Sequence, residues 1–219
     1  MNYFAHGRHF VEDPFFLAGV SLPDWLSVLD RRIRARARRA RPLVESEDRR
    51  LAAFAAGVCR HHEDDAWFHG TRAFAELSLE FTLAARDVLP ADEGFRPSFL
   101  GHILVELLLD AALIEDEPTT AARYYDAIDE LDCELVETLA GQITGSPAAG
   151  LAPWIRRFSA ARFLLDYQED AKLCYRLNQV MQRVRLLPLP ASFQTILPPA
   201  RQRVRERMHE LLTPWETIG

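Results

Sequence analysis

The segment from Phe99 to Ile114 constrains the fold of this chain most. It is apolar around the whole circumference of a helix and still carries three ionisable side chains. It reads FLGHILVELLLDAALI. His102, Glu106 and Asp110 recur every fourth residue, so they lie on one side of the helix, one turn apart. Burying a carboxylate is costly unless it is paired or bound to a metal. The segment therefore predicts a central core helix with a row of potential ligands.

A second row continues the apolar face of an earlier predicted helix. That face runs from Leu51 to Val58, and its continuation is His61, Asp65 and His69, again spaced by four. Each step of four residues rotates the side chain by about 40° around the helix axis, so the three side chains face one position or two adjacent positions. Glu63 and Asp64 fall off this line, and we leave them out of the predicted site.

Either row alone is as consistent with hydrogen-bonded structural residues as with ligands. Two such rows in one chain favour a metal centre, since imidazole and carboxylate are the ligands that Mn, Zn and Fe prefer. We therefore expect one or two divalent ions. His6 and Asp24 are weaker candidates for additional ligands from outside these helices. An aspartate after a proline is usually a turn or cap residue.

Periodicity near 3.6 residues recurs along the chain, and strand-like alternation is hard to find. We predict an all-α single domain over residues 1–219, a bundle of about seven helices with the metal site between core helices. The expected helices span residues 47–69, 72–88, 97–115, 119–142, 153–166, 169–185 and 199–212. Ser46 to Asp48 mark the start of the first, and Gly70 its end. In the first forty-five residues, apolar turns at Phe15–Val20 and Trp25–Leu29 are separated by Pro23.

Composition excludes several classes of protein. With 48% hydrophobic and 26% charged residues, the chain is globular rather than disordered. A net charge of −6 argues against general nucleic-acid binding. No run of eighteen apolar residues and no basic leader with an apolar core are present, so we predict neither a membrane span nor a secretory signal. The scattered cysteines fit a reducing compartment, and we expect a cytoplasmic protein.

Seven arginines fall between residues 31 and 41 of this acidic chain. They predict a local positive patch. It is either a solvated helix end or loop, or a docking surface for an anionic partner, and the sequence leaves both open.

Four motifs, read in order, resemble the acyl carrier protein phosphodiesterase family, a variant of the HD-domain phosphohydrolase superfamily. They are MNYFAH at residue 1, AGVSLPDW at residue 18, GVCRHHEDDAWFH at residue 57 and VELLLD at residue 105. The family pattern is an opening M-N-x-L-A-H, a G-N-x-x-x-D turn, G-I-x-x-H-R-x-I-D-x-x-T-D, and an acidic pair on a later helix. When the two sequences are matched by position, the family pattern implies a role in the site for His6, Asp24, His61, Asp65, His69, Glu106 and Asp110.

The resemblance implies metal-dependent hydrolysis of a phosphodiester, in the type member the release of 4′-phosphopantetheine from holo-acyl carrier protein. It implies an HD-domain-like fold and, once His102 from the row on the core helix is added, a ligand set of His6, Asp24, His61, Asp65, His69, His102, Glu106 and Asp110. Of these, it gives Asp24, Asp65, His69 and Asp110 roles in catalysis. Arg31, Arg34, Arg38 and Arg41 would dock an acidic carrier protein or neutralise the phosphate of a smaller substrate.

The chain departs from the family pattern in being richer in histidine. His69 stands where the family has aspartate, His102 is an addition, and Gly19 and Val20 replace Gly-Asn. Such a site is similar to that of zinc-dependent phospholipase C. Two alternatives stay open: a metal-dependent hydrolase or iron oxygenase acting on a small molecule, and a non-enzymatic helical binding module. In the latter, the polar rows form ion pairs with arginines such as Arg60 or Arg72.

Overall fold

The computed structural model describes residues 1–90 and 94–213 as helices joined by turns, with no strand among them. The predicted all-α class is confirmed. Contacts divide the chain into two compact units, each built from two separate stretches. Unit 1 combines Met1–Ala66 with Glu117–Arg162, and unit 2 combines Trp67–Asp116 with the described residues from Phe163 onward.

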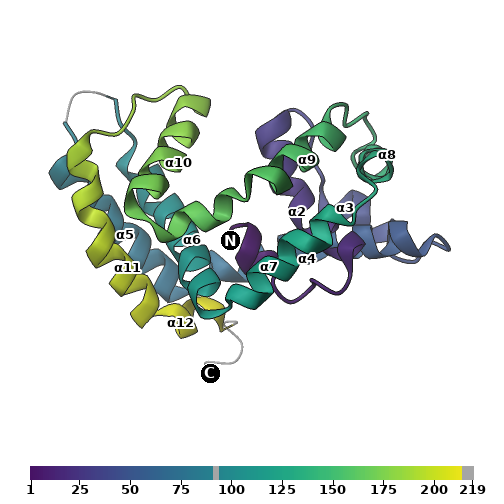
Figure 1. Cartoon of the computed structure of the whole chain (residues 1–219), viewed down its shortest axis with the longest axis horizontal. Helices are drawn as coiled ribbons and strands as arrows, with labels where there is room; N and C mark the ends of the chain where they lie inside the picture. The colour runs from purple at the N-terminus through teal and green to yellow at the C-terminus, as the bar shows by residue number, and fades with distance from the viewer. Residues whose placement is uncertain (91–93, 214–219) are drawn as a thin grey trace. The chain divides into compact units, whose positions relative to one another are not determined.

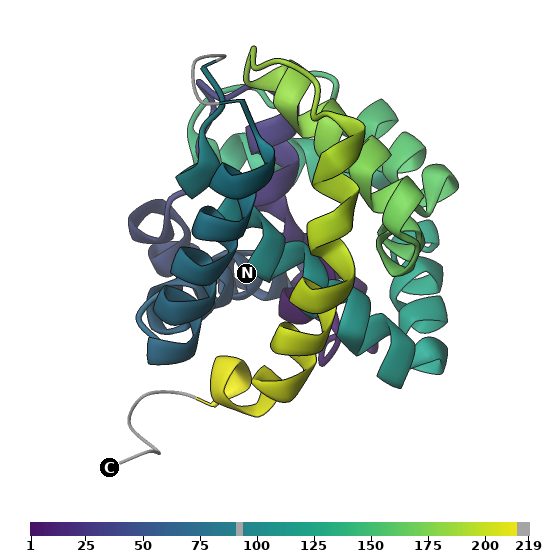
Figure 2. The same cartoon turned by 90° about the vertical axis from the view of Figure 1, so that its left-hand side faces the viewer.

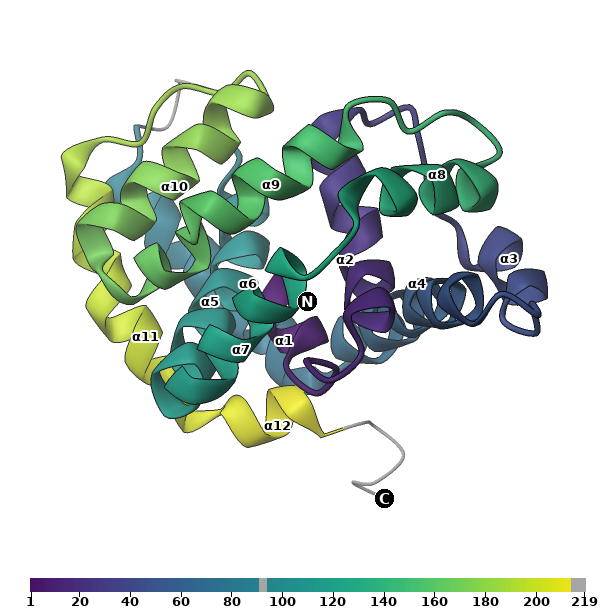
Figure 3. The same cartoon turned by 45° about the vertical axis from the view of Figure 1, so that its right-hand side comes forward.

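Unit 1 is assembled around an aromatic core. Its helices are α1 (Tyr3–Gly7), α2 (Pro14–Leu29), α3 (Ala37–Ala40), η1 (Arg41–Leu43), α4 (Arg49–Phe68) as far as Ala66, α7 (Pro118–Asp129), α8 (Cys133–Thr144) and α9 (Leu151–Ala161). Figure 3 shows α9 beside α2 and α8, which it contacts. Trp25 of α2 is fully buried, and its ring meets those of Trp154 and Phe158 on α9 at 6.1 and 5.8 Å. These contacts hold α2 in the centre of the unit.

Helices α2 and α4 approach each other at two glycines. A Cβ added to Gly19 would overlap the carbonyl oxygen of Phe54, and one added to Gly57 would overlap that of Phe16. Both obstacles are backbone atoms of the other helix, so they cannot rotate away. The two helices therefore come to within backbone contact, which only glycine permits at these positions.

Helix α2 runs unbroken through Pro23, where the sequence predicted a separation. A proline inside a helix costs about 3 kcal/mol because it removes one hydrogen bond and crowds the preceding turn. Leu22, Trp25 and Leu26 are fully buried. Burial of such side chains stabilises by roughly 1.5–3 kcal/mol each, which outweighs the cost of the proline.

Other predicted boundaries shift for local reasons. The first long helix begins at Arg49 rather than near Ser46, because the carboxylate of Asp48 accepts from the amide of Leu51 at 3.3 Å. The predicted helix 119–142 divides into α7 and α8, and Asp132 caps α8 by accepting from Leu135 N at 3.0 Å. The segments 153–166 and 199–212 each divide into two shorter helices.

Unit 2 is built on α6 (Pro97–Asp116). Its other helices are α5 (Arg72–Val88), η2 (Phe163–Gln168), α10 (Asp170–Arg183), η3 (Ala191–Ile196), α11 (Leu197–Glu206) and α12 (Met208–Leu212). Helix α6 contacts α5, η2 and α11, and Figures 1 and 2 show α11 lying along α5 and α6. Its leucines from Leu100 to Leu113 are buried, so the predicted core helix is confirmed.

By length and composition, α6 is also the one described helix that could cross a membrane. Core helices of soluble proteins meet the same criterion, and 67% of its most apolar stretch is buried inside the structure. The finding is weak evidence for a span.

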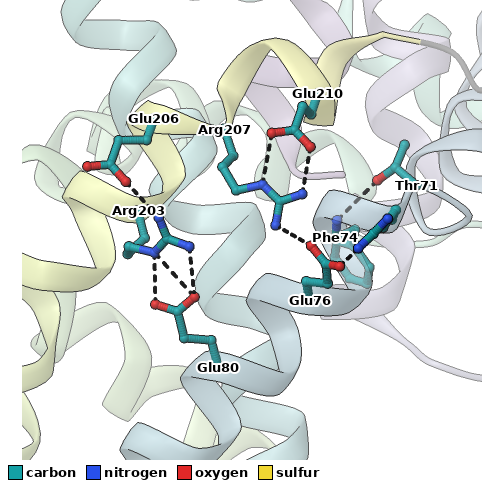
Figure 4. A network of polar contacts seen from close by, with 9 residues as sticks. Thr71, Phe74, Glu76, Glu80, Arg203, Glu206, Arg207 and Glu210 are labelled. Carbon is teal, nitrogen blue, oxygen red and sulfur yellow. Dashed lines mark hydrogen bonds and ion pairs between the residues drawn. The ribbon is translucent and has the colours of Figure 1, made fainter. Parts of the chain in front are cut away.

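Two arginines connect the C-terminal helices to α5 through ion pairs (Figure 4). Arg207 pairs with Glu76 of α5 and with Glu210 of α12, each at 2.6 Å. Arg203 of α11 pairs with Glu80 at 3.0 Å. The bidentate geometry of these arginines adds orientation as well as energy. The N-terminal half of α5 is thereby held against α11 and α12.

Replacing Gly57 by alanine tests the glycine contact in unit 1. We expect Gly57→Ala to destabilise the protein by roughly 2–3 kcal/mol and to lower Tm by about 4–12 °C, because two backbones must separate. Gly141→Ala on α8 is the matched control, since the nearest atom to its added Cβ would be 3.7 Å away. That variant should be stabilised by about 0.5–1 kcal/mol. Equal melting curves for the two variants would contradict the contact.

Candidate metal centres

The first candidate centre lies in unit 1 and joins α1 to α4. One ligand atom from each of His6, His61 and Asp65 lies within 4.8 Å of the other two. His6 Nε2 is 3.3 Å from Asp65 Oδ1, and His61 Nε2 is 3.5 Å from Asp65 Oδ2. The two imidazole rings stack with centroids 4.3 Å apart, and both are buried. Two imidazole nitrogens therefore face one carboxylate.

The other nitrogen of each ring is fixed by an acceptor. His61 Nδ1 lies 2.9 Å from the carbonyl oxygen of Val20, and His6 Nδ1 lies 3.3 Å from Asp64 Oδ2. Arg60 donates to the second oxygen of Asp64 at 2.7 Å. When Nδ1 donates its proton to such a partner, the lone pair of Nε2 points to the opposite side, as in metal-bound histidines. Among the described residues, His6 Nε2 is buried with no partner in hydrogen-bonding geometry.

Electrostatics sets the charge of each group. Burial and the neighbouring His6 lower the pKa of His61 to about 3, so it is neutral at pH 7. Burial raises the pKa of Asp65, but the nearby His6 ring and the amino group of Met1, 2.6 Å from Oδ1, hold that pKa well below its usual range. For His6, burial lowers the pKa, yet Asp64 and Asp65 outweigh it and raise the pKa overall. The centre thus offers a neutral imidazole and an ionised carboxylate.

Asp24 lies near this centre without being one of its three converging ligands. It sits on α2, half-buried, within a helix rather than in the turn that the sequence predicted. Its charge is close enough to raise the pKa of His6. Val20, one turn before it on α2, supplies the carbonyl that contacts His61.

The second candidate centre lies in unit 2. The ligand atoms of His69, His102 and Glu106 all lie within 4.8 Å of one another. Glu106 Oε1 is 2.9 Å from His69 Nε2 and 3.3 Å from His102 Nε2. Burial raises the pKa of Glu106, but the hydrogen bonds with the two imidazoles help to hold it well below the usual range. The carboxylate is ionised at neutral pH.

Six of the eight predicted ligands are thus brought together, in two groups of three. The row that starts on α4 divides, since His61 and Asp65 belong to unit 1, whereas His69 follows the end of α4 and belongs to unit 2. Asp110 is fully buried and belongs to neither group.

Asp64, which the sequence analysis left out of the ligands, is not one of the three converging ligands, but it contacts His6. It is buried and holds His6, and its signal in the sequence was Arg60, four residues earlier on the same helix. The carbonyl of Val20 could not be found from residue types, because it is a backbone group. Glu63, also left out, is exposed.

The arginine-rich segment 31–41 lies on the surface. Arg31, Arg34, Arg38 and Arg41 are all exposed, and within the described part of the chain none of them pairs with a carboxylate. Arg38 and Arg41 line a surface pocket of about 540 Å³ together with Pro42 and Glu45. The predicted positive patch is therefore present and accessible.

Comparison of the chain with models of protein families, with curated proteins and with solved structures finds no match. A functional assignment must therefore rest on the chemistry of the two groups.

The role of Asp64 can be tested by Asp64→Asn, which keeps the shape of the side chain and removes its charge. We expect Zn²⁺ affinity at the His6 centre to fall roughly 10–100-fold, because His6 loses the acceptor that orients its ring. The measurement is competition with a chromophoric chelator, in a His102→Gln background that removes a ligand of the other group. Glu63→Gln, on the exposed side of α4, is the control and should leave the affinity unchanged. Equal affinities for both variants would rule out the role.

Proposed function

We propose that this protein is a metal-dependent phosphodiester hydrolase whose metal is held by His6, His61 and Asp65. One observation carries the proposal: two buried imidazoles turn Nε2 toward one carboxylate while an acceptor holds each Nδ1. Two nitrogen donors and one carboxylate form a set that suits Zn²⁺, and also Mn²⁺ or Fe. The buried His6 Nε2 and the ionised Asp65 fit such an ion.

Each residue has a task in the proposed reaction. A divalent ion held by His6, His61 and Asp65 would polarise a phosphoryl oxygen and would bring the pKa of bound water toward neutrality. Asp65 would contribute the negative charge that attracts the ion. Asp24 is half-buried and close enough for its charge to raise the pKa of His6, and its carboxylate would take the proton of the attacking water. Asp64 and Arg60 keep His6 in orientation.

The purely structural alternative fits the contacts less well. Arg60 pairs with Asp64 and Arg72 with Glu76, so both arginines are engaged outside the ligand triads. Within the described residues no arginine pairs with Asp65. The carboxylate of Asp65 is paired with the amino group of Met1 rather than with an arginine, so the first centre lacks the arginine network that the structural alternative expects.

The substrate class follows from the resemblance and from the surface. We propose an acidic carrier protein, or a smaller phosphodiester, as the substrate of a cytoplasmic enzyme with an HD-domain-like arrangement of helices. In support, the exposed arginines of segment 31–41 form a positive surface on a chain with a net charge of −6. Such a surface attracts and orients an acidic partner.

Hydrolysis of bis(p-nitrophenyl) phosphate tests the activity. Chelator-treated protein should be inactive and should regain turnover with Mn²⁺ or Zn²⁺. His61→Ala should lower the rate roughly 100-fold or more through loss of a ligand, with helicity retained in circular dichroism. His209→Ala, on the exposed side of α12, is the control and should be fully active. No turnover with any metal would overturn the proposal, and tightly held iron without hydrolysis would favour an oxygenase.

The arginine surface is tested with a protein substrate. Replacing Arg34, Arg38 and Arg41 together by alanine should raise KM for holo-acyl carrier protein and flatten its salt dependence, because attraction between the two proteins is lost. Turnover of the small chromogenic substrate should not change. The matched control replaces three exposed arginines elsewhere, Arg86, Arg157 and Arg183. Identical kinetics for the two triple variants would show that the surface does not dock the carrier protein.

A further inference from the structure

We infer that His69, His102 and Glu106 form a second transition-metal site in unit 2, separate from the centre proposed for hydrolysis. The inference goes beyond the proposed function and does not depend on it, because it concerns other residues and is tested by metal binding rather than by turnover. The ligand chemistry is that of Zn²⁺ and related ions. Two imidazole nitrogens and one carboxylate oxygen are softer than the all-oxygen sites of Mg²⁺ or Ca²⁺.

The distances already suit a bound ion. With metal–ligand bonds of about 2.0–2.2 Å, the ligand atoms of a tetrahedral zinc site lie roughly 3.3–3.6 Å apart. In the structure Glu106 Oε1 is 3.3 Å from His102 Nε2 and 2.9 Å from His69 Nε2. The two imidazole nitrogens lie within 4.8 Å of each other, so shifts of about an ångström or less would complete the tetrahedral geometry. His102 and Glu106 share one face of α6, so only His69 comes from another part of the chain.

Charge also favours a cation at this position. Glu106 is only 15% exposed and lies on a helix that otherwise buries leucines such as Leu104 and Leu108. A carboxylate in such surroundings attracts a cation more strongly than one in water does. The side chain of His102 is 47% exposed and that of His69 is 32% exposed. The group therefore opens to solvent, which leaves room for water or another ligand at the fourth coordination position.

Apart from their contacts with Glu106, the two rings are held by packing. The ring centroid of Phe74 lies 4.8 Å from that of His69 and 4.9 Å from that of His102, at steep angles to both. Thr71 fixes Phe74 by capping α5, its hydroxyl accepting from Phe74 N at 3.2 Å (Figure 4). Among the described residues, Nδ1 of neither His69 nor His102 has a hydrogen-bond partner. Because such partners strengthen metal affinity roughly 10–100-fold, this site should bind more weakly than the His6 centre.

Cobalt titration of the metal-free full-length protein tests the inference. Co²⁺ reports its ligands through visible d–d absorption, and Zn²⁺ should displace it. We expect two equivalents to bind, with affinities that differ about 10–100-fold. His102→Gln and Glu106→Gln should each remove the weaker equivalent and its absorption, whereas His61→Ala should remove the tighter one. His209→Ala, the exposed-histidine control, should retain both.

The outcomes separate this site from the proposed hydrolytic centre. A His69→Gln, His102→Gln double variant that still binds two equivalents would overturn the second site. So would a wild-type protein whose single equivalent disappears in His61→Ala. If one equivalent of bound metal is lost in His102→Gln and none is lost in His61→Ala, the result would support the second site and count against the proposed function. Because His102 is half exposed, its substitution should leave the fold intact, which circular dichroism checks.

Discussion

The close approach of α2 to α4 at Gly19 and Gly57 is the constraint on which the His6 centre depends. Gly57 lies one turn before His61, and Gly19 immediately precedes Val20. Backbone contact at the two glycines therefore brings the carbonyl of Val20 to 2.9 Å from His61 Nδ1. A side chain at either glycine would push the helices apart and remove this acceptor. The ring of His61 would then lose its orientation, although every ligand residue would still be present.

The His6 centre also shows how the energetic cost of burying polar groups is offset. Each group of the triad has its charge or its hydrogen-bonding capacity set by a neighbour: His61 by the Val20 carbonyl, His6 by Asp64, and Asp65 by the amino group of Met1. Asp64 is held in turn by Arg60. Arg60 is 46% exposed, so its charge stays largely hydrated while its guanidinium reaches the buried carboxylate. This chain of contacts explains why a largely apolar helix face can end in ionisable residues.

Sequence periodicity predicted those features of the structure that arise within a single helix. The all-α class and the buried α6 follow from spacing within a helix, and the structure contains both. From each predicted row, two side chains one turn apart lie in the same group. What depends on contacts between helices was not predictable. Helix α2 continues through Pro23 because burial of its leucines and Trp25 outweighs the proline. Spacing along the sequence could not show that Asp65 and His69 join different groups, nor that Asp110 joins neither. The single domain over residues 1–219 stays a prediction.

The two groups share a ligand chemistry but differ in how their rings are held, and this difference has a physical consequence. In unit 1, hydrogen-bond acceptors fix both imidazoles, and the rings are buried. In unit 2, the edge of an aromatic ring orients them, and both remain partly exposed. Hydrogen bonds fix a tautomer and raise the basicity of a ligand, whereas packing fixes only the plane of the ring. The first arrangement suits an ion that stays bound, and the second suits an ion that exchanges with solution.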